Sequence, residues 1–139
     1  MNRYQARKLA FQMIYAMEFQ QDVPPAELYA ASVTDRGITE ETDYLQKVFY
    51  GVCTESETLG ALICDHLKDG WKLSRLAKVT LAILRLATYE MLYIDDVPTE
   101  VAINEAINIA KEYDSESAPA FVNGVLNAIA DARGLKTNA

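Results

Sequence analysis

Apolar residues recur along most of the chain at intervals of three and four positions, the spacing that lines one face of an α-helix. The first segment with this pattern covers residues 3–20, where an apolar stripe runs from Ala6 to Met17. Arg7 and Lys8 fall beside this stripe and are expected to face solvent. The pattern predicts an amphipathic first helix with a basic edge.

Breaks in the pattern divide the next part of the chain into shorter elements. A short helix is expected over residues 25–32, after a break that contains Pro24. Residues 40–67 predict either one long helix or two helices joined near Gly51 to Glu55, with Thr39 as the N-cap. The pair Asp69-Gly70 ends this half of the chain.

The second half contains the most apolar segment. Residues 73–79 predict one or two helical turns, and residues 81–94 are apolar on nearly every side, as in a helix at the centre of a bundle. Pro98 and Pro119 suit the first turns of two further helices. The last helix is expected to end at Arg133-Gly134, followed by a frayed tail over residues 135–139.

These elements predict an all-α fold of about six or seven helices with short connections, because no segment alternates apolar and polar residues as a strand does. The length of 139 residues is that of one domain. We expect a single compact domain over residues 1–139, made of two packed helical sub-bundles at about 1–70 and 71–135.

The net charge argues at first against nucleic acid as a partner. The chain has 13 Lys and Arg against 20 Asp and Glu, a formal charge of −7, and a uniformly acidic surface repels phosphates. Two segments depart from this balance. Residues 1–11 contain no acid, and residues 67–88 contain only Asp69. Their cations are Arg3, Arg7 and Lys8 in the first segment and Lys68, Lys72, Arg75, Lys78 and Arg85 in the second. Each segment is either a solvated helix face or a patch that attracts an anionic partner.

The sequence offers no catalytic or metal-binding pattern. Cys53 and Cys64 are separated by about 16 Å along a predicted helical segment, too far for a disulfide, so we expect two reduced, buried thiols. His66 is the only histidine, and no phosphate loop or nucleophile motif is present. We therefore expect no enzymatic activity, no metal and no cofactor. Because neither a signal peptide nor a membrane span is evident, we expect a cytoplasmic location.

Several short motifs carry more information than the periodicity. They are WKLSRL from Trp71, AILRLATYE from Ala82, VPTEVAINEA from Val97 and FVNGVLN from Phe121, together with Ala6-Arg7, Ala10, Gln12 and Tyr15 near the start. In combination they resemble the NusB family of bacterial transcription antitermination factors. The resemblance covers essentially the whole chain.

The resemblance implies an all-α, RNA-binding adaptor without enzymatic activity. Members of the family bind the boxA element of nascent RNA together with the ribosomal protein NusE. With other Nus factors they help RNA polymerase to read through terminators in ribosomal RNA operons. On this basis Arg3, Arg7 and Lys8 are candidate phosphate contacts, and Tyr15 matches a position at the NusE interface.

The start of the last helix is the second candidate RNA contact. Gly124 lies within a predicted helix, where glycine lowers helix stability by about 1 kcal/mol relative to alanine. The Asn-Gly pair is therefore expected to have a role other than stabilising the helix. Free backbone amides in the first turn favour a phosphate. Phe121 is either a stacking face for a base or a core anchor, and Asn123 either bonds a base edge or caps a neighbouring loop. Gly124 is expected to permit close helix packing.

The chain departs from the family pattern in places that bear on affinity. Tyr4 and Gln5 stand where many members have an arginine-rich run, and Ala120 stands where a Lys or Arg is common. Since each missing cation removes a possible phosphate contact, weak binding of RNA without NusE is expected. Thr80 stands where an acid is usual, and Arg85 and Glu90 are expected to make buried or interhelical polar contacts.

Other roles remain open for the same fold. One is a helical protein–protein adaptor with weak or no RNA binding. Another is the NusB-like N-terminal part of an RNA cytosine methyltransferase, against which the chain length argues because no catalytic domain is present. The free protein is either a monomer or a homodimer that masks its RNA-binding face.

Overall fold

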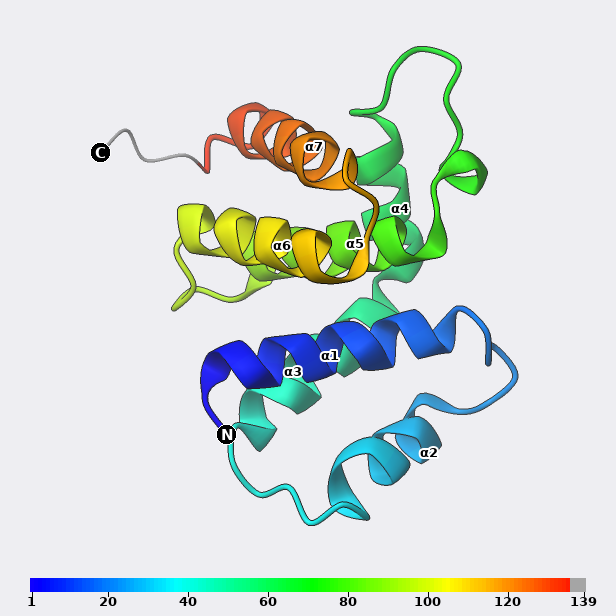
Figure 1. Ribbon diagram of the computed structural model, residues 1–139, viewed down its shortest axis with the longest axis vertical. Helices are drawn as coiled ribbons and strands as arrows, with labels where there is room; N and C mark the ends of the chain where they lie inside the picture. Colours follow the sequence, from blue (N-terminus) through cyan, green and yellow to red (C-terminus); the bar gives the residue numbers. More distant parts are fainter. Residues whose placement is uncertain (136–139) are drawn as a thin grey trace. The chain divides into compact units, whose positions relative to one another are not determined.

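The computed structural model describes residues 1–135, which form seven α-helices joined by turns and loops, with no strand among them (Figure 1). This confirms the predicted all-α fold. The chain divides into two compact units, Met1–Glu55 and a second unit that begins at Ser56. We expected the boundary near residue 70. It lies earlier because the helix after Glu55 packs against helices of the second unit.

The first unit contains α1 (Arg3–Met17), α2 (Pro25–Tyr29) continued by a π turn (Ala30–Thr34), and α3 (Thr42–Thr54). In this unit α1 packs against α3, and α2 contacts both (Figure 1). A capping box begins α1: the Gln5 amide donates to Asn2 Oδ1 at 2.8 Å, and the Asn2 amide donates to Gln5 Oε1 at 2.9 Å. The helix ends at Met17, three residues before the predicted end.

The segment over residues 40–67 forms two helices, α3 and α4 (Ser56–Cys64), which was one of the two predicted alternatives. The prediction of Thr39 as N-cap is wrong. The residue before α3 is Glu41, which has a left-handed backbone with φ of 60° and makes no side-chain cap. Such a conformation costs a non-glycine residue about 1 kcal/mol. A tertiary contact stabilises it here, since Glu41 accepts a bond from Arg3 of α1 at 2.8 Å.

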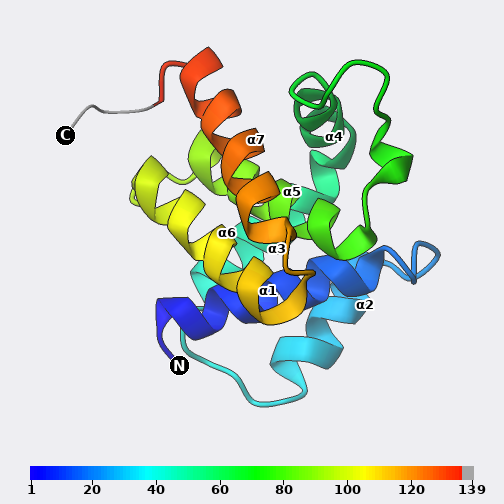
Figure 2. The same cartoon turned by 45° about the horizontal axis from the view of Figure 1, so that its top comes forward.

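The second unit is built around α5 (Lys78–Tyr93), with α4, α6 (Thr99–Tyr113) and α7 (Ala118–Ala132) packed against it (Figure 2). Every residue of α5 from Thr80 to Met91 is buried except Arg85, which is half-buried. The prediction of a central helix is therefore confirmed.

Polar contacts join the ends of these helices. Thr80 Oγ1 at the start of α5 donates to Asp114 Oδ2 after α6 at 2.6 Å. Thr99 Oγ1 at the start of α6 donates to the Leu135 carbonyl at 3.2 Å. Leu135 is thus held, and the remainder of the tail predicted to fray, residues 136–139, lies outside the described residues.

Prolines begin the last two helices as predicted. Pro98 is the N-cap of α6, and Pro119 lies in the first turn of α7. Glu90 on α5 is buried with only 1% of its surface exposed, as expected for a structural polar residue.

The expectation that Gly124 permits close helix packing is wrong. A Cβ atom built on Gly124 meets nothing within 4 Å among the described residues, and the glycine is exposed on α7. Gly60 of α4 is the glycine that does permit a close approach. A Cβ there would lie 3.0 Å from Leu73 Cδ1 and 3.1 Å from an Arg85 guanidinium nitrogen.

We therefore expect Gly124→Ala to raise the free energy of unfolding by about 0.5–1 kcal/mol, because alanine favours the helix and the space is open. Gly60→Ala is the matched control and should not give this gain, since Leu73 and Arg85 would have to move. Urea unfolding followed by circular dichroism measures both. Equal stabilisation by the two substitutions would contradict the assignment of Gly60 as the packing glycine.

Candidate nucleic-acid interface

Two of the basic residues of α1 lie beside one aromatic ring of α3. The guanidinium carbon of Arg3 lies 4.3 Å from the ring centroid of Tyr44, and that of Arg7 lies 5.7 Å from it. Tyr44 is buried, with 5% of its surface exposed. Cation–π attraction of this kind contributes about 0.5–2 kcal/mol per pair, depending on desolvation. The ring thus orients two of the three predicted phosphate contacts.

Arg7 does not face solvent as expected, because only 4% of its surface is exposed. Position 7 lies at the border of the apolar stripe, and α3 covers this border with Tyr44. The aliphatic stem of an arginine tolerates such burial. The periodicity of α1 alone did not indicate this, since a helix does not specify how far its partner covers its flanks. The role of Arg7 in RNA contact stays a prediction.

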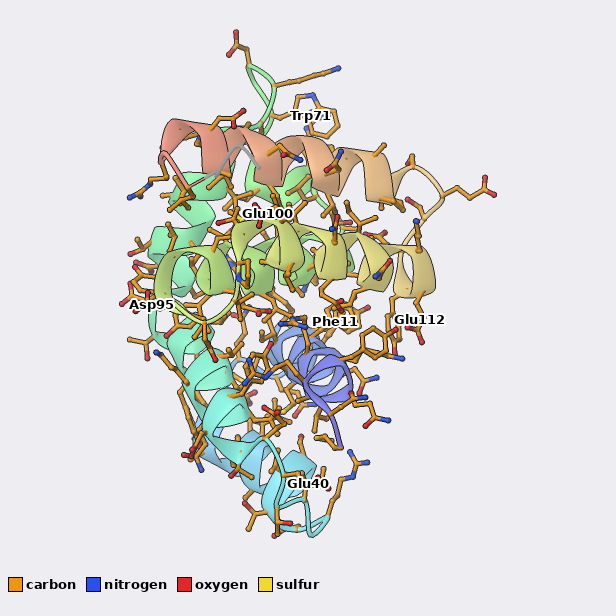
Figure 3. All side chains as sticks on the ribbon, turned by 90° about the vertical axis from the view of Figure 1, so that its left-hand side faces the viewer. Phe11, Glu40, Trp71, Asp95, Glu100 and Glu112 are labelled. Carbon is orange, nitrogen blue, oxygen red and sulfur yellow. The ribbon has the colours of Figure 1, made fainter. Side chains whose placement is uncertain are left out.

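Two acids from the loop before α3 face the basic start of α1. Glu40, labelled in Figure 3, accepts a bond from the Met1 ammonium at 2.7 Å, and Glu41 pairs with Arg3 Nε at 2.8 Å. Lys8 is half-buried with its ammonium 5.4 Å from the ring centroid of the exposed Tyr4. The basic edge is therefore partly neutralised. The sequence did not indicate the role of Glu40 and Glu41, because they lie 39 and 38 residues along the chain from their partners Met1 and Arg3.

At the start of α7, Phe121 is half-buried and Asn123 is exposed. The Asn127 amide donates to the Asn123 carbonyl at 2.8 Å and to Asn123 Oδ1 at 2.7 Å. Asn123 therefore accepts a bond within its own helix and does not cap a neighbouring loop. Its amide nitrogen is the polar group that remains for a ligand.

The first turn of α7 offers fewer free amides than expected. The Ala118 amide donates to the Ser115 carbonyl at 3.1 Å, Pro119 has no N–H, and the Phe121 amide donates to the Ser117 carbonyl at 3.3 Å. A helix start usually leaves several amides for an anion. Few backbone amides therefore remain at the start of α7 for an anion.

The predicted RNA-binding residues lie in both compact units. Arg3, Arg7 and Lys8 belong to the first unit, whereas Phe121 and Asn123 belong to the second. Within the first unit, Arg3 and Arg7 share the ring of Tyr44, whereas Lys8 lies beside Tyr4. The role of each set in RNA binding stays a prediction.

Tyr15, the predicted NusE contact, belongs to a row of three aromatic side chains on α1. Its ring stacks on Phe11 at a centroid distance of 6.1 Å and meets the edge of Phe19 at 5.1 Å. Phe11 is buried, Tyr15 is half-buried, and Phe19 is 60% exposed just beyond the helix end. Phe19 was not among the predicted contacts, although its spacing of four residues from Tyr15 is a signal that the sequence contains.

The remaining candidate chemistry is limited. No group of three or more metal-ligating side chains occurs within residues 1–135. Both cysteines are free and half-buried rather than fully buried, and burial raises the pKa of the Cys53 thiol to about 11. A thiol with this pKa stays protonated at neutral pH and is a poor nucleophile. In the part of the chain that is described, no helix is both long and apolar enough to span a bilayer.

Comparisons with known proteins agree with this architecture. The family model for NusB matches residues 4–131. The transcription antitermination protein NusB of Rubrobacter xylanophilus is 46% identical over 134 residues, which cover 94% of this chain and 91% of the relative. Among solved structures, T. maritima NusB superposes with a TM-score of 0.87 at 33% identity and covers 94% of this chain and 92% of its own.

A second similar structure is that of a complex. It is a chain of the crystal structure of the antitermination factors NusB and NusE in complex with double-stranded RNA, with a TM-score of 0.81 and 29% identity over 95% of this chain and 99% of that one. The family match and the relatives together confirm the resemblance found in the sequence. The chain belongs to the NusB family of transcription antitermination proteins.

Proposed function

We propose that this protein binds boxA-type single-stranded RNA together with NusE and so promotes read-through in ribosomal RNA operons. The observation that carries the proposal is the open backbone at Gly124. The glycine weakens its helix, yet no neighbour within the described residues uses the space that it leaves. Because Gly124 has no side chain, a ligand can approach the backbone closely there, beside the exposed Asn123 and the half-buried Phe121.

Each side chain has a separate part in this proposal. The ring of Phe121 stacks on a base, and the Asn123 amide nitrogen donates to a base edge. On the first unit, Arg3, Arg7 and Lys8 supply positive charge that neutralises RNA phosphates. Because Glu40 and Glu41 compete for the basic edge, the protein alone binds weakly and NusE supplies further contacts.

Further partners and a cellular location follow from the same proposed function. RNA polymerase and other Nus factors are the partners of the assembled complex, and the cytoplasm is its location. A second copy of the chain is a further candidate partner, which would compete with RNA if it covered the start of α7.

The alternative is a helical adaptor that binds only proteins. The exposure of Phe19 beside Tyr15 favours a protein-binding face on α1 but does not require RNA. The two functions differ in RNA selectivity, since a protein-only adaptor should not distinguish boxA RNA from a scrambled sequence at any salt concentration.

Phe121→Ala should weaken binding of labelled boxA RNA in the presence of NusE by roughly 5- to 100-fold, because stacking contributes about 1–3 kcal/mol per base. Fluorescence anisotropy measures this change. Tyr93→Ala is the matched control, since it removes another aromatic of the second unit, 40% exposed, that is outside the proposed site. Equal affinities of Phe121→Ala and the unaltered protein would favour the role of Phe121 as a core anchor.

Glu41→Gln should tighten RNA binding by about fivefold at low salt, because it removes a carboxylate 2.8 Å from Arg3. Glu27→Gln makes the same change in net charge at an exposed position on α2 and should have a smaller effect. A salt series distinguishes the two, since an extra phosphate contact makes the salt dependence steeper by about 0.7 in log–log slope. Identical slopes would show that Arg3 does not contact the RNA.

Phe19→Ala should weaken binding of NusE by roughly tenfold or more, as truncation of an exposed aromatic anchor commonly does. Titration calorimetry without RNA isolates this contact. Tyr4→Ala is the control, because Tyr4 is an exposed aromatic near the other end of α1 and should leave the affinity for NusE unchanged. An unaltered affinity of Phe19→Ala would place the NusE contact elsewhere.

A further inference from the structure

The loop between α4 and α5 is positively charged in an acidic chain. This segment, residues 67–77, is called the basic connector below. It contains Lys68, Lys72 and Arg75 against Asp69, and Lys78 follows as the first residue of α5. Lys68, Lys72 and Arg75 are all exposed, and the structure records no ion pair for them within residues 1–135. The proposed boxA site does not use these cations.

Trp71 lies in the middle of the basic connector with 45% of its surface exposed. Tryptophan is mostly buried on average because its indole has a large apolar surface. In Figure 3 the labelled side chain lies on the loop that extends beyond α7, and the same loop stands out from the helices of the second unit in Figures 1 and 2. An exposed indole among cations needs an explanation other than core packing.

The basic connector is held in a defined shape by hydrogen bonds and one anchor. The Trp71 amide donates to the Lys68 carbonyl at 2.9 Å, so a tight turn fixes the backbone between these two residues. A second turn follows, in which the Arg75 amide donates to the Lys72 carbonyl at 2.9 Å. Leu73 packs onto α4 at Gly60, where a Cβ would come within 3.0 Å of its Cδ1. While Leu73 packs onto α4, the cations and Trp71 stay exposed to solvent.

We propose that the basic connector is a second binding surface for single-stranded RNA. Lys68, Lys72 and Arg75 contact phosphates, and the Trp71 indole stacks on an unpaired base. The indole favours a single strand, because in a duplex the faces of the bases are already stacked on one another. An acidic protein segment would satisfy the cations but offers no flat partner for Trp71. The inference takes its class of ligand from the proposed function and adds a contact outside the boxA site.

The test uses the intrinsic fluorescence of Trp71, which is the only tryptophan of the chain. Oligouridine added to the full-length protein at low salt should quench this emission saturably, because stacking on a base quenches an indole. The double substitution Lys72→Gln with Arg75→Gln should weaken the apparent affinity about tenfold or more and lower the log–log salt slope by roughly 1.4, which is two single-strand phosphate contacts.

The matched control removes two exposed lysines elsewhere, Lys47→Gln on α3 with Lys111→Gln on α6. Its net charge equals that of the double substitution in the basic connector, so it should retain most of the affinity if the contact is local. Equal weakening by the two double variants would overturn the proposal, as would absence of quenching by oligouridine. Equal quenching by duplex RNA, or by polyglutamate of matched charge, would also overturn it and would assign the surface to another anion.

Failure of this inference is distinguishable from failure of the proposed function. Phe121→Ala should leave quenching by oligouridine unchanged, and the variant of Lys72 and Arg75 should retain the preference for boxA over scrambled RNA with NusE. Loss of boxA selectivity with intact quenching would reject only the proposed function. Intact selectivity without quenching would reject only the second surface.

Discussion

The second unit depends on the burial of α5 on all sides. A helix that is apolar around its whole circumference is stable only when other helices cover it, and α4, α6 and α7 pack against α5 here. This requirement commits one face of α7 to the core, with Val122, Val125 and Leu126 buried. Asn123 and Gly124 are left on the opposite face, where they are exposed. The position of the candidate RNA contact thus follows from the packing of the core.

The same requirement explains the basic connector. Because α4 and α5 both pack within the second unit, the chain between them must run over its surface, where loops carry exposed and polar residues. Leu73 supplies one apolar contact, at Gly60, and the cations around it stay in solvent. The exposed Trp71 among these cations is the feature from which we infer a binding role.

The distribution of charge explains why the protein is expected to need a second protein in order to bind RNA tightly. The net charge of −7 opposes binding of RNA, and the basic edge of α1 is reduced further by Glu40 and Glu41. Such a surface binds a polyanion weakly, and binding becomes useful when a second protein adds contacts on the same strand. The aromatic row of α1 that ends in the exposed Phe19 is the face that we propose for that protein.

The sequence by itself determined the all-α fold, the central position of the helix over residues 81–94, the proline starts of the last two helices and the family. These properties are local or are carried by motifs, so periodicity and residue types suffice to read them. Only the tertiary structure decided that Arg7 is buried beside Tyr44, that Glu41 pairs with Arg3, and that Gly60 rather than Gly124 permits a close approach. Each of these depends on residues far apart in the chain, because the periodicity of one helix does not specify which neighbour covers its flanks or which loop lies against its end.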